Sequence, residues 1–409
     1  MKIAVITSSY PRFPGDGAAP FIKSLAEGYA KLGHTVYVIA PHDPQVIDGE
    51  LNNLVQIRRY KYIWPQSLSK MGHGQSLKGD AKLSGLSLIL VPLFLVFGFL
   101  CLYRVCKKAN IDIIHVNWVL PNGPIAYCVS KLLKIPYIMS LHGSDIFVSN
   151  KNIVFSKIAR IIINSATSIT ACSQELMDST IKLGGEGKIL LLPWGADPEI
   201  FSPIFYSGEL REKFLIKENE ILVLAIGRMV YKKGFDVLLS AWEKIITKFP
   251  YAKLIVGGDG PLKIVLEQQA KILGIESTVK FIGRIDWREM PAYLATADIF
   301  VLPSIKDKYG NVDGLPTILL EAMSCGTACV ASDIGGVPLV IKKWENGVLF
   351  PEKSINELAD VLFLLFKNDI IRSELGLGAR KSIEDRFNWE NVSSQIIELF
   401  NNAIGLESK

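Results

Sequence analysis

The sequence predicts an α/β protein made of two domains, each with a parallel sheet covered by helices. Short apolar runs alternate with helical segments, and this alternation pauses near residue 194 and resumes near residue 221. Glycine-bearing loops follow several predicted strands, at the sheet edge where parallel α/β folds bind ligands. The 409 residues are enough for two domains of ordinary size.

We place the first domain at 1–194, the second at 195–385, and a helix that returns to the first domain at 386–409. The strands predicted in the first domain are apolar runs bounded by Gly, Pro or polar residues: 2–7, 35–40, 111–116, 136–141, 167–171 and 188–192. Its predicted helices are 20–32, which Gly33 ends, one that finishes near 134, and one after Ser173.

The second domain repeats the same alternation. Its predicted strands are 221–226, 252–256, 279–282, 299–303 and 328–332. Its predicted helices are 235–248, one that starts at Pro316, and 355–367; the returning helix is 389–404.

Composition excludes several function classes. A net charge of +5 is too small for a dedicated nucleic-acid binder. The six cysteines lie mostly among apolar neighbours and form no Cys-x-x-Cys pair, so we expect them to be structural. The apolar run that begins at Met1 is too short for a secretory signal, so we expect a cytoplasmic protein.

Residues 52–108 interrupt the α/β pattern and form a candidate membrane-associated segment. Residues 52–85 carry six basic side chains and one acidic one, and residues 84–103 carry no charge. Twenty residues of helix would be about 30 Å long, the thickness of a bilayer core. We favour a helix on an anionic membrane surface over a buried core helix. A true span is least favoured, because it would separate strands of one sheet.

Residues 313–323 carry the strongest functional pattern. Asp313 and Glu321 are eight positions apart, with a turn at Gly314 and an apolar run that predicts a mostly buried helix. Pro316 suits the first helical position, and the free N–H groups of the first turn form an anion site. The pattern therefore predicts a pocket for a molecule that carries both phosphate and hydroxyl groups.

This stretch resembles the signature of the retaining glycosyltransferases of family 4, also called group 1, which reads Glu-Gly-x-Pro-x-x-x-x-Glu before Ala-Met. Asp313 replaces the first Glu, which keeps the charge and shortens the side chain by one methylene. Three other motifs are similar: His-Gly-x-Asp at 142–145, Gly-Arg-x-x-x-x-Lys-Gly at 227–234 and Gly-x-Gly-Pro at 258–261. The resemblance is strongest from 225 to 350.

The resemblance implies a GT-B fold, in which two Rossmann-like domains face each other across a cleft. It implies that Arg228 and Lys233 hold the diphosphate of a nucleotide sugar and that Glu321 holds the ribose hydroxyls. It also implies that Asp313 contacts the sugar hydroxyls and that His142 orients the sugar. His142, Arg228, Lys233 and Asp313 would thus be the catalytic residues.

Further substrate-binding positions follow from the same resemblance. They are the loop and helix-start positions Gly17, Asp145, Gly283, Arg284, Gly314, Leu315, Pro316 and Thr317. Gly17 is the retained half of the Gly-Gly pair usual in the family, where a phosphate can approach the backbone. Gly283 and Arg284 would lie beside the nucleobase.

These features predict a retaining, metal-independent glycosyltransferase that needs no cofactor. No Asp-x-Asp pair follows a predicted strand, and the glycines at 257–260 do not fit the Gly-x-Gly-x-x-Gly fingerprint of nicotinamide enzymes. The expected donor is a UDP- or GDP-sugar. The expected acceptor is a glycan or lipid-linked saccharide in the synthesis of a cell-surface polysaccharide or glycolipid, on the inner face of the cell membrane.

Two other function classes stay open at this point, because a fold does not fix a function. A sugar-nucleotide epimerase could use the same fold. A non-catalytic, glycan-binding scaffold would be consistent with the Asp at position 313. A phosphorylase of the glycogen type would need a pyridoxal lysine, for which the sequence offers no context.

Overall fold

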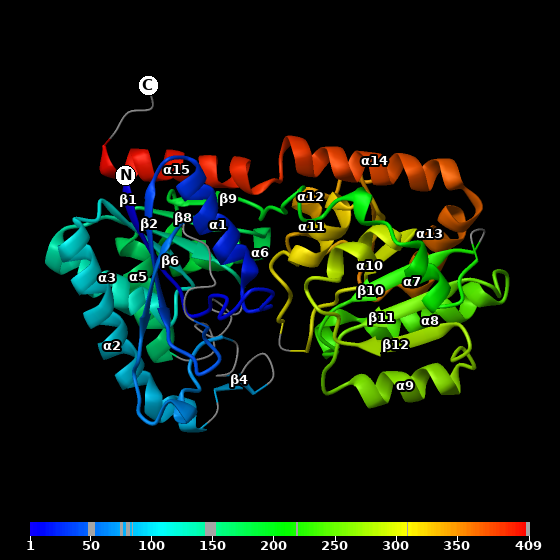
Figure 1. The fold of residues 1–409 in the computed structure, drawn as a ribbon, viewed down its shortest axis with the longest axis horizontal. Helices are drawn as coiled ribbons and strands as arrows, with labels where there is room; N and C mark the ends of the chain where they lie inside the picture. The colour runs from blue at the N-terminus through cyan, green and yellow to red at the C-terminus, as the bar shows by residue number, and fades with distance from the viewer. Residues whose placement is uncertain are drawn as a thin grey trace. The chain divides into compact units, whose positions relative to one another are not determined.

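The computed structural model describes residues 1–47, 54–73, 77–78, 82–83, 85–143, 153–217, 220–308 and 310–405. The chain divides into two compact units (Figure 1). The first unit contains Met1–Leu192 together with Trp389–Lys409, and the second contains Pro193–Asn388. The predicted boundaries, 194/195 and 385/386, fall a few residues away, so that Trp194 and Asn388 belong to the second unit.

The first unit is built on a seven-stranded parallel sheet in the order β3-β2-β1-β6-β7-β8-β9. Its strands are β1 Lys2–Ile6, β2 Thr35–Pro41, β3 Gln56–Tyr60, β6 Ile113–Asn117, β7 Tyr137–Leu141, β8 Ser168–Ala171 and β9 Ile189–Leu191. A separate hairpin pairs β4 Leu77–Lys78 with β5 Lys82–Leu83. Every residue of β6 and β7 is buried, as expected for a parallel sheet covered on both faces.

Helices cover both faces of this sheet. Those of the first unit are α1 Pro20–Lys31, α2 Gly85–Ala109, α3 Asn122–Leu133, α5 Ile153–Ser165, α6 Gln174–Thr180 and α15 Trp389–Ile404, with short turns η1 Gln66–Leu68 and η2 Ile181–Gly185. Helices α2 and α3 pack on one face of the sheet, and α1 and α15 pack on the other.

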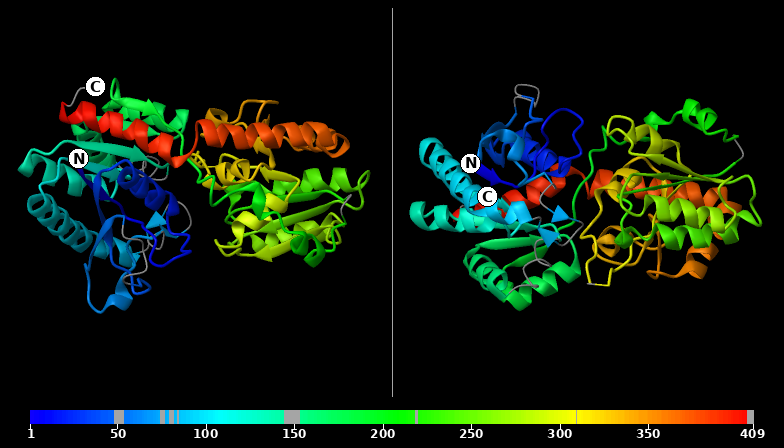
Figure 2. Two further views of the ribbon diagram at one scale, coloured as in Figure 1. Left: turned by 45° about the horizontal axis from the view of Figure 1, so that its top comes forward. Right: turned by 90° about the horizontal axis from the view of Figure 1, so that it is seen from below.

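Helix α15 lies along α1 within the first unit (Figure 2). The ring of Phe400 packs edge-on against Tyr29, with 5.4 Å between ring centroids, and against His115, at 5.6 Å. Gly28 allows the two helices to approach, because a Cβ at this position would clash with Ser393. The core of the first unit therefore includes residues from both ends of the sequence.

Residues 52–85 were predicted to interrupt the α/β pattern, but part of this segment forms strand β3 of the sheet. It pairs in parallel register with β2, from Gln56 opposite Tyr37 to Tyr60 opposite Pro41. Because β3 is an edge strand, it pairs on one side only and keeps exposed polar residues such as Arg58. Its sequence therefore lacks the continuous apolar run by which the central strands were predicted.

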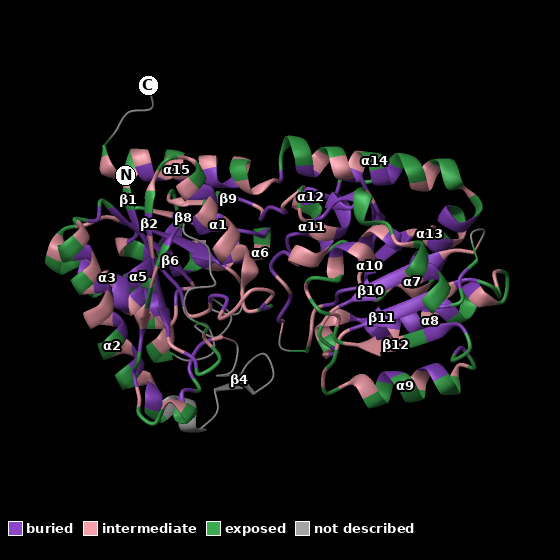
Figure 3. Cartoon of the chain, viewed as in Figure 1, coloured by how far each residue is buried: buried purple, intermediate pink, exposed green. Residues whose placement is uncertain are grey.

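Helix α2 packs one face against the sheet. Its buried residues recur every four positions: Leu90, Phe94, Gly98, Leu102 and Cys106. A Cβ on Gly98 would meet the ends of Ile125 and Tyr60, so the glycine allows close packing. In Figure 3 the helix carries both buried and exposed residues.

This packing excludes two of the three alternatives for α2, the membrane-spanning helix and the wholly buried core helix. Residues Ile89–Ala109 are long and apolar enough to span a membrane by length and composition. However, β1 and β6, which precede and follow the helix, pair with each other in one sheet, so a crossing helix is inconsistent with the fold. A wholly buried helix is also wrong, because Ile89 is 72% exposed and Val96 is 53% exposed.

The second unit is built on a six-stranded parallel sheet in the order β12-β11-β10-β13-β14-β15. Its strands are β10 Leu222–Ile226, β11 Lys253–Gly257, β12 Val279–Gly283, β13 Ile299–Leu302, β14 Ala328–Ser332 and β15 Val348–Phe350. Its helices are α7 Gly208–Lys213, α8 Phe235–Ile246, α9 Lys263–Ile272, α10 Met290–Thr296, α11 Thr317–Ser324, α12 Val337–Val340, α13 Ile355–Lys367 and α14 Asp369–Asp385, with turns η3 Pro203–Phe205 and η4 Tyr231–Lys233.

Candidate active site

The loop after β10 carries the predicted cations Arg228 and Lys233. Gly234 turns the chain into α8 with a φ of +64°, and a Cβ there would clash with the carbonyl oxygen of Pro303. Glycine is therefore required at this turn. The methylene stem of Lys233 lies over Gly227, because a Cβ on Gly227 would be 3.4 Å from Cδ and Cε of the lysine. The turn thus directs Lys233 back over the carboxyl end of β10.

Asp313 forms ion pairs with two lysines from this loop. Its Oδ2 lies 2.6 Å from Nζ of Lys233, and its Oδ1 lies 2.9 Å from Nζ of Lys232. Burial alone would raise the pKa of Asp313, but Lys233 and Lys232 outweigh it and hold the pKa well below its usual range. The carboxylate is therefore ionised at neutral pH, and the three side chains together carry a net positive charge.

The backbone of Asp313 is fixed by the turn that follows β14. Gly335 has a φ of +63°, and a Cβ on it would clash with the carbonyl oxygen of Asp313. The N–H of Gly336 donates a hydrogen bond to the carbonyl oxygen of Gly314. The two glycines thus hold the acidic residue in place beside the lysines.

Helix α11 begins at Thr317, directly after this loop. Pro316 is the N-cap residue, with extended backbone angles of −67° and 119°, so the prediction that it occupies the first helical position is wrong by one residue. The fixed φ of proline suits both positions, which is why the sequence alone did not separate them. Leu319 and Leu320 are fully buried, as predicted, and anchor the helix with its free N–H groups at the sheet edge.

Glu321 lies in the second turn of α11. Burial raises the pKa of this carboxyl group to about 7, and a hydrogen bond from Thr317 only partly offsets this. Its protonation state therefore changes close to neutral pH. An acid with such a pKa accepts hydrogen bonds from hydroxyl groups when it is ionised and can donate one when it is protonated.

This raised pKa predicts how stability depends on pH. The folded pKa is about 7 and the ordinary value is 4.5, so Glu321 lowers the stability of the fold progressively as pH rises from about 4.5 to about 7. The isosteric variant Glu321→Gln should therefore melt at a higher temperature than the wild type at pH 8 and at a similar temperature near pH 4. Thermal unfolding at both pH values measures this. If the melting temperatures of variant and wild type differed by the same amount at pH 8 and at pH 4, the raised pKa of Glu321 would be contradicted.

Three loops of the second unit are joined at the carboxyl edge of the sheet. The N–H of Gly258 donates to the carbonyl of Gly283 over 2.6 Å, and the N–H of Met229 donates to the carbonyl of Asp259 over 2.8 Å. A Cβ on Gly258, whose φ is +126°, would clash with the carbonyl oxygen of Gly227. The structure thus brings the predicted Gly283 next to the loop that carries Arg228, while the neighbouring Arg284 is exposed.

In the first unit, His142 follows the end of β7. Its Nε2 lies 3.1 Å from Oδ1 of Asn117, and its ring lies 4.3 Å from that of Trp118 and 5.2 Å from that of Phe21. Burial, with a smaller contribution from His115, holds the pKa of His142 well below its usual value. The imidazole is therefore neutral at physiological pH.

The loop after β1 is held by an ion pair between Arg12 and Asp16, with 2.7 Å between Nε and Oδ2. Gly17 follows directly, and a Cβ on it would meet no atom within 4 Å, so the backbone is open to approach. The predicted residue Asp145 lies outside the described residues.

Sequence reasoning missed two residues of this arrangement. Lys232 stands at an unspecified position of the Gly-Arg-x-x-x-x-Lys-Gly motif and received no role, although it lies 2.9 Å from Asp313, against 2.6 Å for Lys233. Asn117, which contacts His142, ends a strand next to β7 in the sheet. Its place at a strand end, where parallel strands meet at one edge, is the signal that could have identified it.

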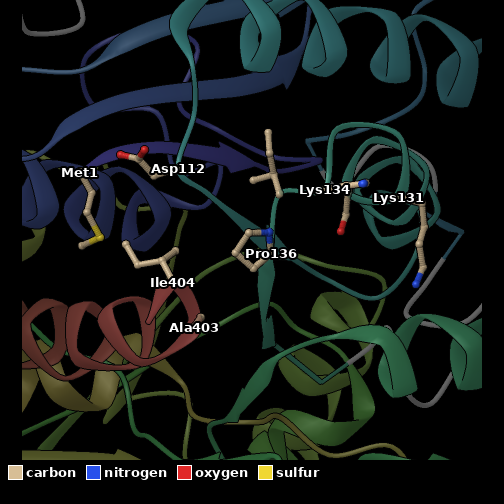
Figure 4. Close-up of a pocket in the computed structure, with 9 residues that line it drawn as sticks. Met1, Asp112, Lys131, Lys134, Pro136, Ala403 and Ile404 are labelled. Atoms are coloured by element: carbon tan, nitrogen blue, oxygen red, sulfur yellow. The ribbon is translucent and has the colours of Figure 1, made fainter. Parts of the chain in front are cut away.

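Two other kinds of site, a metal site and a separate pocket, were considered away from the carboxyl edges of the sheets. Among the described residues, no group of three or more His, Cys, Asp or Glu side chains is placed to hold a metal ion. A hollow of about 920 Å³ lies at the opposite edge of the first sheet, where Met1, Asp112 and Pro136 precede β1, β6 and β7 (Figure 4). It contains none of the predicted site residues.

Comparison with known proteins identifies the family. Residues 15–200 match the description Glycosyltransferase Family 4, and residues 207–382 match Glycosyl transferases group 1. An N-acetyl-alpha-D-glucosaminyl L-malate synthase from Bacillus anthracis is 30% identical over 294 residues, which cover 71% of this chain and 75% of that protein. The chain is a family 4 glycosyltransferase. The predicted family and enzyme class are confirmed.

Solved structures show the fold of this glycosyltransferase. A sucrose-phosphate synthase from Thermosynechococcus elongatus superposes with a TM-score of 0.76 at 20% identity, over 99% of each chain. The Anabaena protein HepE, in complex with UDP, gives 0.73 at 19% identity, over 98% of this chain and all of that one. These neighbours confirm the predicted GT-B fold. The enzyme class also removes the non-catalytic scaffold as an alternative.

Proposed function

We propose that this glycosyltransferase transfers a sugar from a nucleoside-diphosphate donor, with retention of the anomeric configuration and without a metal ion. The observation that carries the proposal is the cluster of Lys232, Lys233 and Asp313 beside the start of α11. Two ammonium groups and the free N–H groups of a helix form a site that favours a diphosphate. Arg228, in the same loop, adds a guanidinium that can bind phosphate with two donors.

The chemistry needs most assistance at the leaving group. The nucleoside diphosphate gains negative charge as the glycosidic bond breaks, and fixed cations and N–H dipoles stabilise that charge. In the proposed complex the diphosphate competes with Asp313 for the two lysines. The released carboxylate is then available to the sugar hydroxyls and can stabilise positive charge that develops on the ring.

The remaining residues have supporting roles in this proposal. Glu321, with its pKa of about 7, accepts hydrogen bonds from the ribose hydroxyls. Gly283 and Arg284 contact the nucleobase. The neutral imidazole of His142 is suited to hydrogen-bond a sugar hydroxyl. A glycosidase-type pair of carboxylates is not proposed, because Glu321 is assigned to the ribose.

The donor is a UDP- or GDP-sugar. The complex of HepE with UDP supports the first of these, since that protein shares the fold. For the acceptor we propose a glycan or a lipid-linked saccharide, used in the synthesis of a cell-surface polysaccharide or glycolipid. The apolar and basic surface of α2 supports a lipid-linked acceptor and a peripheral position on the inner face of the cell membrane.

A donor screen tests the proposal. The purified enzyme is offered UDP- and GDP-sugars in the presence of a chelator, and released UDP or GDP is measured together with donor binding. We expect release from one donor, and loss of release in Arg228→Ala and Lys233→Ala. Absence of binding to every nucleotide sugar would overturn the proposal, and a requirement for added metal would overturn its metal-independent part.

A further inference from the structure

Helix α2 has an apolar face that no described part of the protein covers. Ile89, Leu93, Val96 and Phe97 are 72%, 42%, 53% and 41% exposed. Their spacing places them on one side of the helix, where Phe97 borders the buried stripe that begins at Leu90. Large apolar residues scattered singly on a surface are common, but four on one helix face form a patch.

A basic groove continues this apolar face. It has a volume of about 540 Å³ and lies between β3 and the second half of α2. Its basic lining residues are Arg58, Arg59, Lys61, Arg104 and Lys108. Among the described residues that line it, none carries a carboxylate.

Four of these cations belong to exposed residues and one does not. Arg58, Lys61, Arg104 and Lys108 are exposed, and Arg58 donates hydrogen bonds to neighbours in its own strand, the carbonyl oxygen of Ile57 and Oε1 of Gln56. Arg59 instead donates hydrogen bonds to the carbonyl oxygens of Pro11 and Pro41, so it serves the fold.

Two of the exposed cations, Arg58 from β3 and Arg104 from α2, line the groove together with Cys101. Burial raises the pKa of the Cys101 thiol, and Arg104 and Arg58 both partly offset this. Both walls of the groove therefore contribute a guanidinium group to the surroundings of this thiol.

Phe97 connects the two features, because it belongs to the apolar face and also lines the groove. Along α2 the exposed side thus changes from apolar at Ile89 to basic at Arg104 and Lys108, a rise of about 22 Å to Arg104 and about 28 Å to Lys108 at about 1.5 Å per residue. An anionic bilayer has the matching order, with acyl chains below a layer of phosphate groups. A soluble acidic partner would match the cations but leave the apolar face in water.

We propose that the exposed face of α2 and the basic groove form one membrane-docking surface. The apolar side chains insert among the acyl chains, and the groove binds the phosphate headgroup of an anionic phospholipid. The proposal rests on the proposed function only in that docking would bring the enzyme to a lipid-linked acceptor. The site lies in the first unit and uses none of the residues assigned to the donor.

Sedimentation with vesicles tests this surface. We expect the wild-type enzyme to bind vesicles of phosphatidylglycerol and phosphatidylcholine, to bind pure phosphatidylcholine weakly, and to be released by high salt. Each cation near an anionic surface changes affinity by about fivefold. The double variant Arg58→Gln/Arg104→Gln should therefore bind about 25-fold more weakly.

The matched control is Lys271→Gln/Lys367→Gln, which removes the same charge from two exposed positions in the second unit. It should bind as the wild type does. The variant Ile89→Ser/Val96→Ser should lose vesicle binding and keep the melting temperature, because both side chains are already exposed. Equal binding by the groove and control variants would overturn the proposal, since net charge alone would then explain binding.

Two further results would also overturn it. One is that the wild type ignores anionic vesicles. The other is that the wild type is a dimer in solution and Ile89→Ser/Val96→Ser makes it a monomer, since a second copy would then cover the apolar face. Donor hydrolysis without vesicles separates this proposal from the proposed function. A groove variant that hydrolyses the donor normally but fails to bind vesicles would support the docking surface and leave the proposed transferase function unaffected.

Discussion

Replacing Lys233 with alanine is expected to lower kcat/KM for the sugar donor by about 10²–10³-fold, the usual effect of removing one group that stabilises charge in a transition state. Its ammonium group lies 2.6 Å from Asp313, in a turn that Gly234 fixes, so it is already positioned before the donor binds. Positioned charges assist catalysis most because they need no reorganisation during the reaction.

The measurement is the initial rate of nucleotide release and of transfer, across a range of donor concentrations. Lys232→Ala should cause a smaller loss, because Lys233 remains, and the double variant should lose more than either single one. Lys271→Ala, an exposed lysine at the end of α9, is the control and should be fully active. If Lys233→Ala retained wild-type kcat/KM, the diphosphate site proposed here would be wrong.

Replacing Asp313 with asparagine is expected to separate binding from turnover. Turnover should fall by about 10²-fold, because the group proposed to stabilise the sugar in the transition state is lost. Binding of UDP or GDP should be equal or tighter, because the nucleotide no longer competes with a carboxylate for Lys232 and Lys233. Calorimetric titration of the nucleotide and steady-state kinetics measure the two effects.

The conservative variant Asp313→Glu provides the control. It restores the residue usual in the family at this position and keeps the carboxylate. Its rate should therefore stay within about tenfold of the wild-type rate, which corresponds to a change in barrier of at most about 1.36 kcal/mol. The pKa of Asp313 is held low, so a loss of activity between pH 8 and pH 6 belongs to another group, such as Glu321. Weaker nucleotide binding in Asp313→Asn would contradict the proposed competition.

Much of the fold was predictable from local patterns. Strands such as β6 and β10 are buried on both faces, so their sequences are continuous apolar runs that few other structures produce. Helix α8 was predicted within two residues of its end, because its apolar residues recur with helical spacing and a glycine precedes it. The site loops were predicted because glycine is required where backbones come close, as at Gly258 and Gly234.

Other features depend on tertiary contacts that local patterns do not encode. Helix α14 is polar on most positions, and it is held partly by Arg380, whose guanidinium donates to the carbonyl oxygens of Pro198, Phe201 and Ser324. Helix α2 is apolar on both its buried and its exposed side, so its periodicity could not show which side faces the sheet. The pairing of Lys232 with Asp313 joins two loops far apart in sequence.

The place of α15 in the first unit has a consequence for synthesis on the ribosome. The core around Tyr29 and His115 is complete only when Phe400 packs against both side chains, and Phe400 is translated after the whole of the second unit. The first unit therefore cannot reach its final form as it emerges, although domains often fold in the order of translation. The second unit is continuous in sequence and has no such delay. The face of α1 that packs against α15 thus stays uncovered until residues 389–404 have been translated. We expect a chaperone to bind the nascent chain during this interval.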